Sequence, residues 1–205
     1  MQKEVKKSWA LFMGIGVIMI AHGLQMQLMG IRSVLEGFSV LTTGIFMSGY
    51  YVGYFIGSKT TPNFVSKVGH IRVFAAFASL ASLSALLAVV YVNPIMWTLS
   101  RFITGVSLVS CYVVTESWLN DRATNKNRGQ LLSAYMMVIF FGLAIGMLLL
   151  NVSEPKNYEP FILVSVLLSI ALVPILLTKR PAPKFKKIET ISIVELYKIS
   201  PLGTF

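Results

Sequence analysis

The sequence predicts an all-α membrane protein with six transmembrane helices and both termini in the cytoplasm. Of its 205 residues, 55% are hydrophobic and only 13% are charged, whereas soluble domains carry roughly 25% charged residues. The mean hydropathy is +0.72. The apolar residues form continuous runs about as long as the ~20 helical residues that cross a ~30 Å hydrocarbon core. Helices are expected because lipid offers backbone groups no hydrogen-bond partner, and the runs lack the alternation of barrel strands.

The six predicted spans follow one another with short connections. They lie at about residues 8–30, 39–58, 71–92, 95–116, 130–151 and 160–178. The first follows "MQKEVKK", which is similar to the start of a signal peptide. Its apolar run is longer than the roughly 7–15 residues of a signal peptide and no small-residue cleavage motif follows, so a retained span is expected. Pro94 marks the turn between the third and fourth spans.

The distribution of Lys and Arg predicts the orientation of the spans. Segments on one side carry Lys3, Lys6, Lys7, Lys59, Lys67, Arg72, Arg122, Lys126, Arg128, Lys179, Arg180, Lys184, Lys186, Lys187 and Lys198. The opposite side carries only Arg32 and Lys156. The positive-inside rule therefore places both termini in the cytoplasm. The net charge of +10 does not indicate nucleic-acid binding, because it lies between the apolar runs and not on one amphipathic face.

Small residues recur at helical spacing in two of the spans. Gly49, Gly53 and Gly57 are four residues apart in the second span, and Gly142 and Gly146 have the same spacing in the fifth. Such stripes let helix backbones approach closely in lipid. They fit static packing, and they also fit smooth contacts along which helices slide or rock; the two interpretations are compatible.

Arg101 is the most informative polar residue within a span. It lies about six residues, or ~9 Å, into the fourth span from the outer side. A buried cation costs a few kcal/mol or more and normally faces a cavity or a partner. Arg101 either extends to the outer interface or belongs to a substrate or proton pathway. Gly105, one turn later on the same face, leaves room beside it.

Three further side chains are candidates for that pathway. His22 and Gln25 share a face of the first span. Histidine titrates near neutral pH, so His22 is either a proton relay or a neutral hydrogen-bonded group between helices. Tyr112 of the fourth span, like Tyr50, Tyr51 and Tyr54 of the second, either lines a cavity or packs. No metal cluster, cofactor motif or set of paired nucleophile and base is present in the sequence, so neither an enzyme nor a cofactor is expected.

Two predicted cytoplasmic loops carry charges of both signs. The second and third spans are joined through "NFVSKVGHIRVF", where Gly69 allows a tight bend. The loop after the fourth span holds Glu116 and Asp121. Acids at a cytoplasmic helix end oppose the positive-inside bias, so their presence calls for an explanation. One candidate is pairing with Lys67 or Arg72 across the neighbouring loop. The gate-loop residues so defined are Ser66, Lys67, Gly69, Arg72, Glu116, Asp121 and Arg128.

These motifs, in this order, resemble the N-terminal half of a major facilitator superfamily transporter. That family has the loop pattern Gly-x-Leu-x-Asp-Arg-x-Gly-Arg-Arg between its second and third spans. Here the stretch is "PNFVSKVGHI" followed by Arg72, in which Lys67 and Gly69 match while Pro62, Ser66 and His70 depart. The family's Arg-x-x-x-Gly signature in the fourth span is matched by Arg101 and Gly105. The strings "EGFS", "GHIRVFA", "ESWLNDRA" and "RGQLLSAYM" look like a bacterial subfamily without a firmly assigned substrate.

The resemblance covers roughly residues 8–180 and implies secondary transport of a small solute by alternating access. Family members have two six-span halves that rock about a site at the membrane midplane. Residues 1–180 would form the first half in a bacterial inner membrane, and residues 181–205 look like the central cytoplasmic loop, with the second half absent. Expected partners are membrane lipid, a small-molecule substrate, and a separate second half or a homodimer, but no nucleic acid. The alternative is a truncated, non-transporting remnant or a regulatory membrane partner.

The resemblance generates a prediction about Ser66. The family usually has an acid at this position, which similar transporters use to latch the inner gate against the other half. Serine can cap a helix but supplies no charge, so a weaker and less charge-dependent latch is expected here. Replacing the equivalent residue in a full-length relative, as Ser66→Asp, should shift the balance between inward-open and outward-open states. An unchanged balance would refute this prediction.

Overall fold

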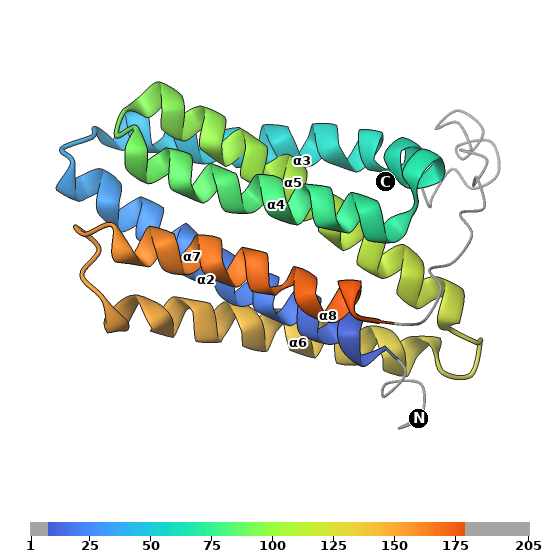
Figure 1. Ribbon diagram of the computed structural model, residues 1–205. Coiled ribbons are helices and arrows are strands. Elements are labelled where there is room, and N and C mark those ends of the chain that lie inside the picture. Colours follow the sequence, from blue (N-terminus) through green and yellow to red (C-terminus); the bar gives the residue numbers. More distant parts are fainter. Residues whose placement is uncertain (1–7, 179–205) are drawn as a thin grey trace, which may run out of the picture.

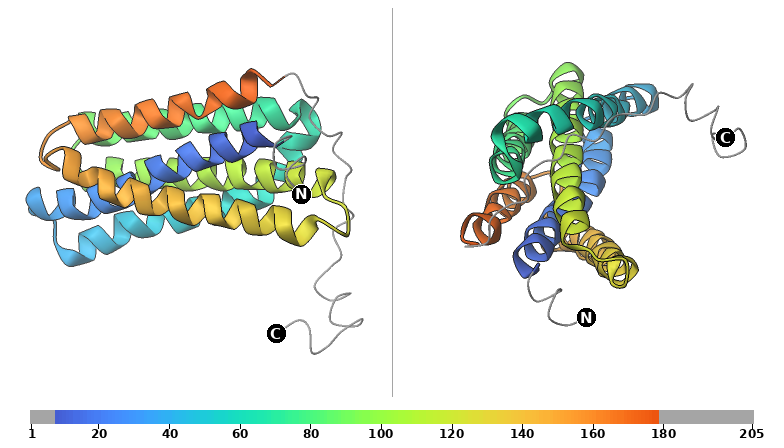
Figure 2. Two further views of the ribbon diagram at one scale, coloured as in Figure 1. Left: turned by 90° about the horizontal axis from the view of Figure 1, so that it is seen from below. Right: turned by 90° about the vertical axis from the view of Figure 1, so that its right-hand side faces the viewer.

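The computed structural model describes residues 8–178, and within this range every regular element is helical, with no strand. The all-α prediction is thus confirmed for the described residues, while the expected central-loop segment 181–205 lies outside them. The elements are α2 (Trp9–Leu35), α3 (Val40–Val68), α4 (His70–Val90), α5 (Pro94–Arg122), α6 (Arg128–Leu149), η1 (Leu150–Val152), α7 (Glu159–Ile170) and α8 (Leu172–Leu176). They run lengthwise along one bundle (Figures 1 and 2).

Local sequence signals determine where several helices begin and end. Ser39 caps α3 by accepting a hydrogen bond from the Thr42 backbone N–H at 3.1 Å. Asn93 caps α5 in the same way, accepting from the Met96 N–H at 2.9 Å, and Pro94 follows as the first helical residue. Gly69 has φ +87° and separates α3 from α4. A side chain at this φ would be strained, so glycine makes the tight turn.

The helix α3 is longer than the predicted second span. The sequence indicated an end near residue 58, but α3 continues through Pro62 to Val68. Lys59 and the hydroxyl residues beside it end the apolar run without ending the helix, because hydropathy marks where a chain leaves lipid and not where helical hydrogen bonds stop. The segment expected as a loop, 59–68, is therefore a helical extension.

Five segments are long and apolar enough to cross a membrane. They are Trp9–Leu35, His70–Val90, Pro94–Arg122, Arg128–Val152 and Glu159–Leu176. The helix α3 is not among them, because its glycines, tyrosines and hydroxyl residues lower its hydropathy. The six predicted transmembrane spans thus correspond to five segments that satisfy this criterion and one helix that does not.

The helices pack in two groups. In Figure 1, α3, α4 and α5 lie above α2, α6, α7 and α8. The helix α5 packs against α3 and α4, and α2 packs against α6 and α7. The groups meet where α4 contacts α7, and there the Ser82 and Ser165 hydroxyls are 2.7 Å apart. Short connections reverse the chain each time, so α3 and α5 run parallel, and α2 begins at the same end of the bundle where α8 ends (Figure 1).

Glycines bring the backbones of α3 and α5 into direct contact. A Cβ on Gly53 would overlap the carbonyl oxygen of Phe102, and a Cβ on Gly105 would overlap the carbonyl oxygen of Tyr50. A Cβ on Gly49 would lie 2.9 Å from the Thr98 carbonyl oxygen. The predicted stripe therefore faces α5 and permits close van der Waals packing, which holds helices together in lipid. We call this contact the α3–α5 seam.

The contact between α2 and α6 has the same design, and we call it the α2–α6 seam. A Cβ on Gly146 would overlap the carbonyl oxygen of Ile20, and one on Gly142 would lie 2.9 Å from the Gly16 carbonyl oxygen. Gly23 of α2 faces the Leu143 carbonyl oxygen, as Gly105 of α5 faces that of Tyr50. The residue spacings of the two seams are identical, so α2 pairs with α6 as α5 pairs with α3. Transporter folds are often built from such internal repeats.

The seams predict how a methyl group affects stability. Gly53→Ala forces the backbones of α3 and α5 apart and should lower the free energy of unfolding by about 1–3 kcal/mol, the usual cost of overpacking. Gly44→Ala is the matched control on the same helix, because nothing lies within 4 Å of its added Cβ. It should be neutral or slightly stabilising. Thermal unfolding in detergent measures both, and equal effects would contradict a close α3–α5 contact.

Candidate functional site

Arg101 lies deep within the bundle and lacks a conventional partner. Its residue surface is 1% exposed, and its guanidinium Cζ lies 4.8 Å from the centre of the Tyr50 ring. Among residues 8–178 its Nε and Nη1 atoms have no hydrogen-bond partner, and no carboxylate lies within ion-pair distance. The charge is therefore held by a cation–π contact with α3 and not by an acid.

Tyr50 joins Arg101 to His22. The His22 ring, from α2, stacks on the Tyr50 ring with centroids 5.3 Å apart and planes inclined by 21°. His22 is buried, and its Nδ1 has no hydrogen-bond partner among the described residues. The position of Tyr50 follows from the α3–α5 seam, since its carbonyl oxygen lies against Gly105, one turn from Arg101. The structure thus brings together side chains from three helices. Arg101 and His22 were predicted as pathway residues, and Tyr50 as a residue that lines a cavity or packs.

A buried hydroxyl network lies beside Arg101. Gln25 of α2 donates from Nε2 to Thr104 Oγ1 of α5 at 3.5 Å, and Thr104 Oγ1 lies 2.8 Å from Ser84 Oγ of α4. Ser100 donates to the Ser84 carbonyl oxygen at 2.7 Å. Gln25 was predicted and the three hydroxyl residues were not. Their signal was present, because Ser100 and Thr104 are four residues apart and flank Arg101 in the sequence.

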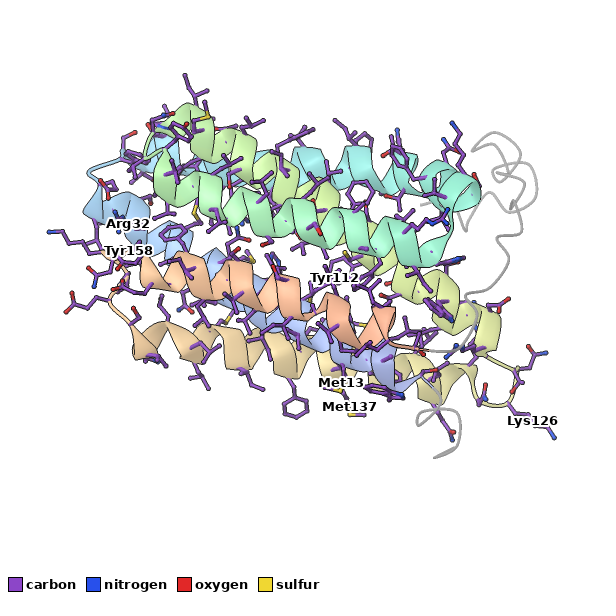
Figure 3. All side chains as sticks on the ribbon, in the orientation of Figure 1. Met13, Arg32, Tyr112, Lys126, Met137 and Tyr158 are labelled. Atoms are coloured by element: carbon purple, nitrogen blue, oxygen red, sulfur yellow. The ribbon has the colours of Figure 1, made fainter. Side chains whose placement is uncertain are left out.

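A cavity of about 360 Å³ opens next to Tyr50, between α3, α5 and α6. It is lined by Tyr50, Tyr51, Tyr54, Tyr112, Glu116, Met136 and Ile139. In Figure 3, Tyr112 lies in the middle of the bundle. Met137, the residue after the cavity-lining Met136, lies near the lower edge of the view. The volume falls within the roughly 300–1,000 Å³ of small-molecule sites. We call it the tyrosine cavity.

The two ends of the tyrosine cavity carry opposite charges. Arg101 lies behind Tyr50 at one end. Glu116 lines the other end, about 22 Å farther along α5 by helical rise, and accepts a hydrogen bond from the Tyr135 hydroxyl at 3.2 Å. Between them, the Tyr112 hydroxyl donates to Met19 Sδ at 3.0 Å, which fixes that ring against α2. The aromatic wall therefore runs from Tyr50, whose ring contacts a buried cation outside the lining, to the exposed carboxylate of Glu116.

The predicted gate-loop residues lie at one end of the bundle but do not pair as expected. Glu116 and Asp121 form no ion pair with Lys67 or Arg72 within residues 8–178. All four side chains lie on exposed or half-exposed positions, where water weakens the attraction between opposite charges. Ser66, within α3, donates instead to the Asn63 carbonyl oxygen at 2.8 Å. Arg128 is exposed at the first position of α6.

His70 provides a contact between α4 and α5 that was not predicted from the sequence. It is buried at the first position of α4, and its Nε2 lies 3.1 Å from the Ser117 hydroxyl of α5. Its ring meets Trp118 edge-on at 6.1 Å. The guanidinium of Arg122 lies 5.3 Å from the same indole and donates a hydrogen bond to Ser8, which precedes α2, at 3.4 Å. This end of the bundle is thus joined by aromatic and hydroxyl contacts.

The unpaired state of Arg101 predicts an unusual effect on stability. Arg101→Leu removes a buried charge and should raise the free energy of unfolding by roughly 1–3 kcal/mol. This is the ~2.5–3.5 kcal/mol cost of Arg at the centre of a membrane helix, less the ~0.5–2 kcal/mol of the lost cation–π contact. Thr104→Val is the neighbouring control. Its hydroxyl is fully hydrogen-bonded, so its loss should lower stability by about 0.6 kcal/mol. Thermal unfolding in nanodiscs tests both, and a destabilised Arg101→Leu variant would reveal an anionic partner.

Comparison with known proteins agrees with this architecture. The sequence model of the Major Facilitator Superfamily matches residues 8–200. The chain is 28% identical over 158 residues to an uncharacterised MFS-type transporter, YcaD, of Escherichia fergusonii, a match covering 76% of the chain and 41% of that protein. It is 27% identical over 164 residues to YcaD of Escherichia coli O9:H4, covering 80% and 43%.

A third relative comes from another genus. An uncharacterised MFS-type transporter of Yersinia pestis is 31% identical over 133 residues, covering 65% of the chain and 35% of that protein. The chain therefore spans less than half the length of the curated relatives it matches. The match of the family model to nearly all of the chain, on a bundle of apolar helices, shows a multi-pass membrane protein that belongs to the Major Facilitator Superfamily.

Proposed function

We propose that the chain forms the N-terminal six-span half of a secondary transporter that moves a small solute by alternating access. Membership of a transporter superfamily supports this proposal, as does a cavity of ligand size among its helices. The transport cycle would require a second six-span half, supplied by another segment, another chain or a second copy. The two halves would rock about a site near the midplane of a bacterial inner membrane.

The buried and unpaired Arg101 is the observation that carries the proposal. A charge that costs stability within a membrane protein and has no acidic partner is generally kept for function. Arg101 would attract an anionic group of the substrate or a carboxylate involved in proton coupling. His22 and Gln25 would add polar contacts, and Tyr112 would form part of the wall.

The membrane placement is part of the same proposal. The helix α3 would be the sixth span, because it runs parallel to α5 along the glycines of the α3–α5 seam and so would share its depth in the bilayer. The excess of Lys and Arg would place the Glu116 end of the cavity and both termini in the cytoplasm. The gate-loop residues would then lie at the cytoplasmic entrance, and residues 181–205 would lead away from it.

Transport measurements test the role of Arg101. In proteoliposomes that contain the chain together with the second half that completes it, uptake of a panel of small organic cations, anions and neutral solutes should identify a substrate. Arg101→Ala and Arg101→Lys should then reduce its uptake at least about tenfold, a change equal to 1.4 kcal/mol. The Lys substitution keeps a charge but loses the planar guanidinium that lies over Tyr50.

Lys126→Ala, in the exposed connection between α5 and α6, removes a cation far from the cavity and should leave uptake unchanged. Uptake that is unaffected by Arg101→Ala would refute the role given to Arg101. A wild-type chain that binds to a partner but transports nothing in the panel would favour the regulatory or non-transporting alternative.

A further inference from the structure

We propose that the Glu116 end of the tyrosine cavity binds an organic ammonium cation. This inference rests on the proposed function, because it names the substrate class of the same cavity. Three observations carry it: the aromatic rings that line this end, a carboxylate without a counter-charge, and apolar side chains that complete the wall.

The aromatic rings provide electron-rich faces around one space. Tyr54 of α3 and Tyr112 of α5 have ring centroids 6.4 Å apart with planes inclined by 53°, and Tyr50 and Tyr54 are 6.0 Å apart at 44°. Tilted rings from two helices present both faces and edges to the cavity. The faces of such rings attract Lys, Arg or alkylammonium groups that lie within about 6 Å.

The carboxylate of Glu116 has no cation of its own. It is exposed at the cavity wall, and within residues 8–178 no Lys, Arg or His nitrogen lies within ion-pair distance. The Tyr135 hydroxyl, at 3.2 Å, donates to Glu116 Oε1 and so orients the group. Because Glu116 is exposed, its carboxylate is accessible to a ligand that enters the cavity. A ligand with one positive charge would balance the charge of this carboxylate.

The rest of the wall selects an organic cation over a metal ion. Met136 and Ile139 of α6 line the cavity together with the tyrosines. Calcium and magnesium ions need about six oxygen ligands, whereas this end offers one carboxylate, phenol groups and hydrocarbon. Alkyl groups on a nitrogen suit this mixture, since Met side chains adapt to irregular apolar shapes.

Arg101 determines the orientation of the ligand. Its charge lies against the Tyr50 ring, about 22 Å along α5 from Glu116. Cations are repelled from the Tyr50 end and attracted to the Glu116 end. The ligand therefore places its ammonium group between Tyr54, Tyr112 and Glu116, and a neutral or anionic group toward Tyr50.

Two probes of equal shape test the charge requirement. Choline and 3,3-dimethylbutan-1-ol differ in the replacement of the quaternary nitrogen by carbon. Titration calorimetry with the full chain in nanodiscs should give choline at least about tenfold tighter binding, the effect expected from combined cation–π and carboxylate contacts. Equal affinity for the two probes, or no binding of either, would overturn the proposal.

Matched variants locate the site. Glu116→Gln should weaken choline binding at least about tenfold, whereas Glu154→Gln, at an exposed acid between η1 and α7, should leave it unchanged. Tyr54→Leu removes an aromatic face and should weaken binding by a similar factor, because the cation loses its attraction to that ring. Tyr54→Phe should stay within about threefold, since the ring remains and the Tyr54 hydroxyl has no hydrogen bond among the described residues.

If the Glu116→Gln variant does not fold, the two variants Tyr54→Leu and Tyr54→Phe still test the proposal. Tyr54 is 38% exposed, so its replacement disturbs little packing. Choline binding that is insensitive to both Glu116→Gln and Tyr54→Leu would overturn the proposal. Failure of cation binding while uptake of another solute still depends on Arg101 would refute this inference alone. Cation binding without any Arg101-dependent uptake would refute the proposed transport and leave the binding site standing.

Discussion

The direct contact between the backbones of α3 and α5 is the constraint on which the site depends. At Gly53 and Gly105 each helix lies against a carbonyl group of the other. This contact sets the Tyr50 ring beside the Arg101 guanidinium, and the ring in turn supports His22 and begins the aromatic wall. Any side chain at either glycine would separate the helices, and the cation–π contact would be lost with the seam.

The two seams show that this helix packing does not require the charged and aromatic residues of the candidate site. Gly142, Gly146 and Gly23 join α2 to α6 with the spacing found between α3 and α5. At the positions that correspond to Arg101 and Tyr50, however, this second seam has Met19 and Leu143. The same glycine spacing occurs in both seams, whereas the charged and aromatic residues, Arg101 and Tyr50, occur only at the α3–α5 seam. The site is therefore an asymmetric addition to a symmetric scaffold.

The sequence was sufficient for features that depend on one helix at a time. Apolar runs predicted the helices, glycine spacing predicted close packing, and the charge of Arg101 within a span marked it as unusual. The extension of α3 to Val68 was missed because hydropathy does not report helical hydrogen bonding. The tyrosine cavity and the contact of His70 with Ser117 depend on which faces of separate helices meet. No spacing within one helix contains that information.

The proposed transport and the proposed cation binding both require that the tyrosine cavity be open to water within the membrane bundle. Tyr51 lines the cavity and is 66% exposed, and Phe141 of α6 is 68% exposed but lies about 200° around that helix from the cavity-lining Ile139. In a Cys111→Ala background, Tyr51→Cys and Phe141→Cys can be treated with a charged, membrane-impermeant thiol reagent in proteoliposomes. We predict rapid labelling at position 51 and little at position 141, which faces lipid. Equal labelling rates at both positions would contradict the claim.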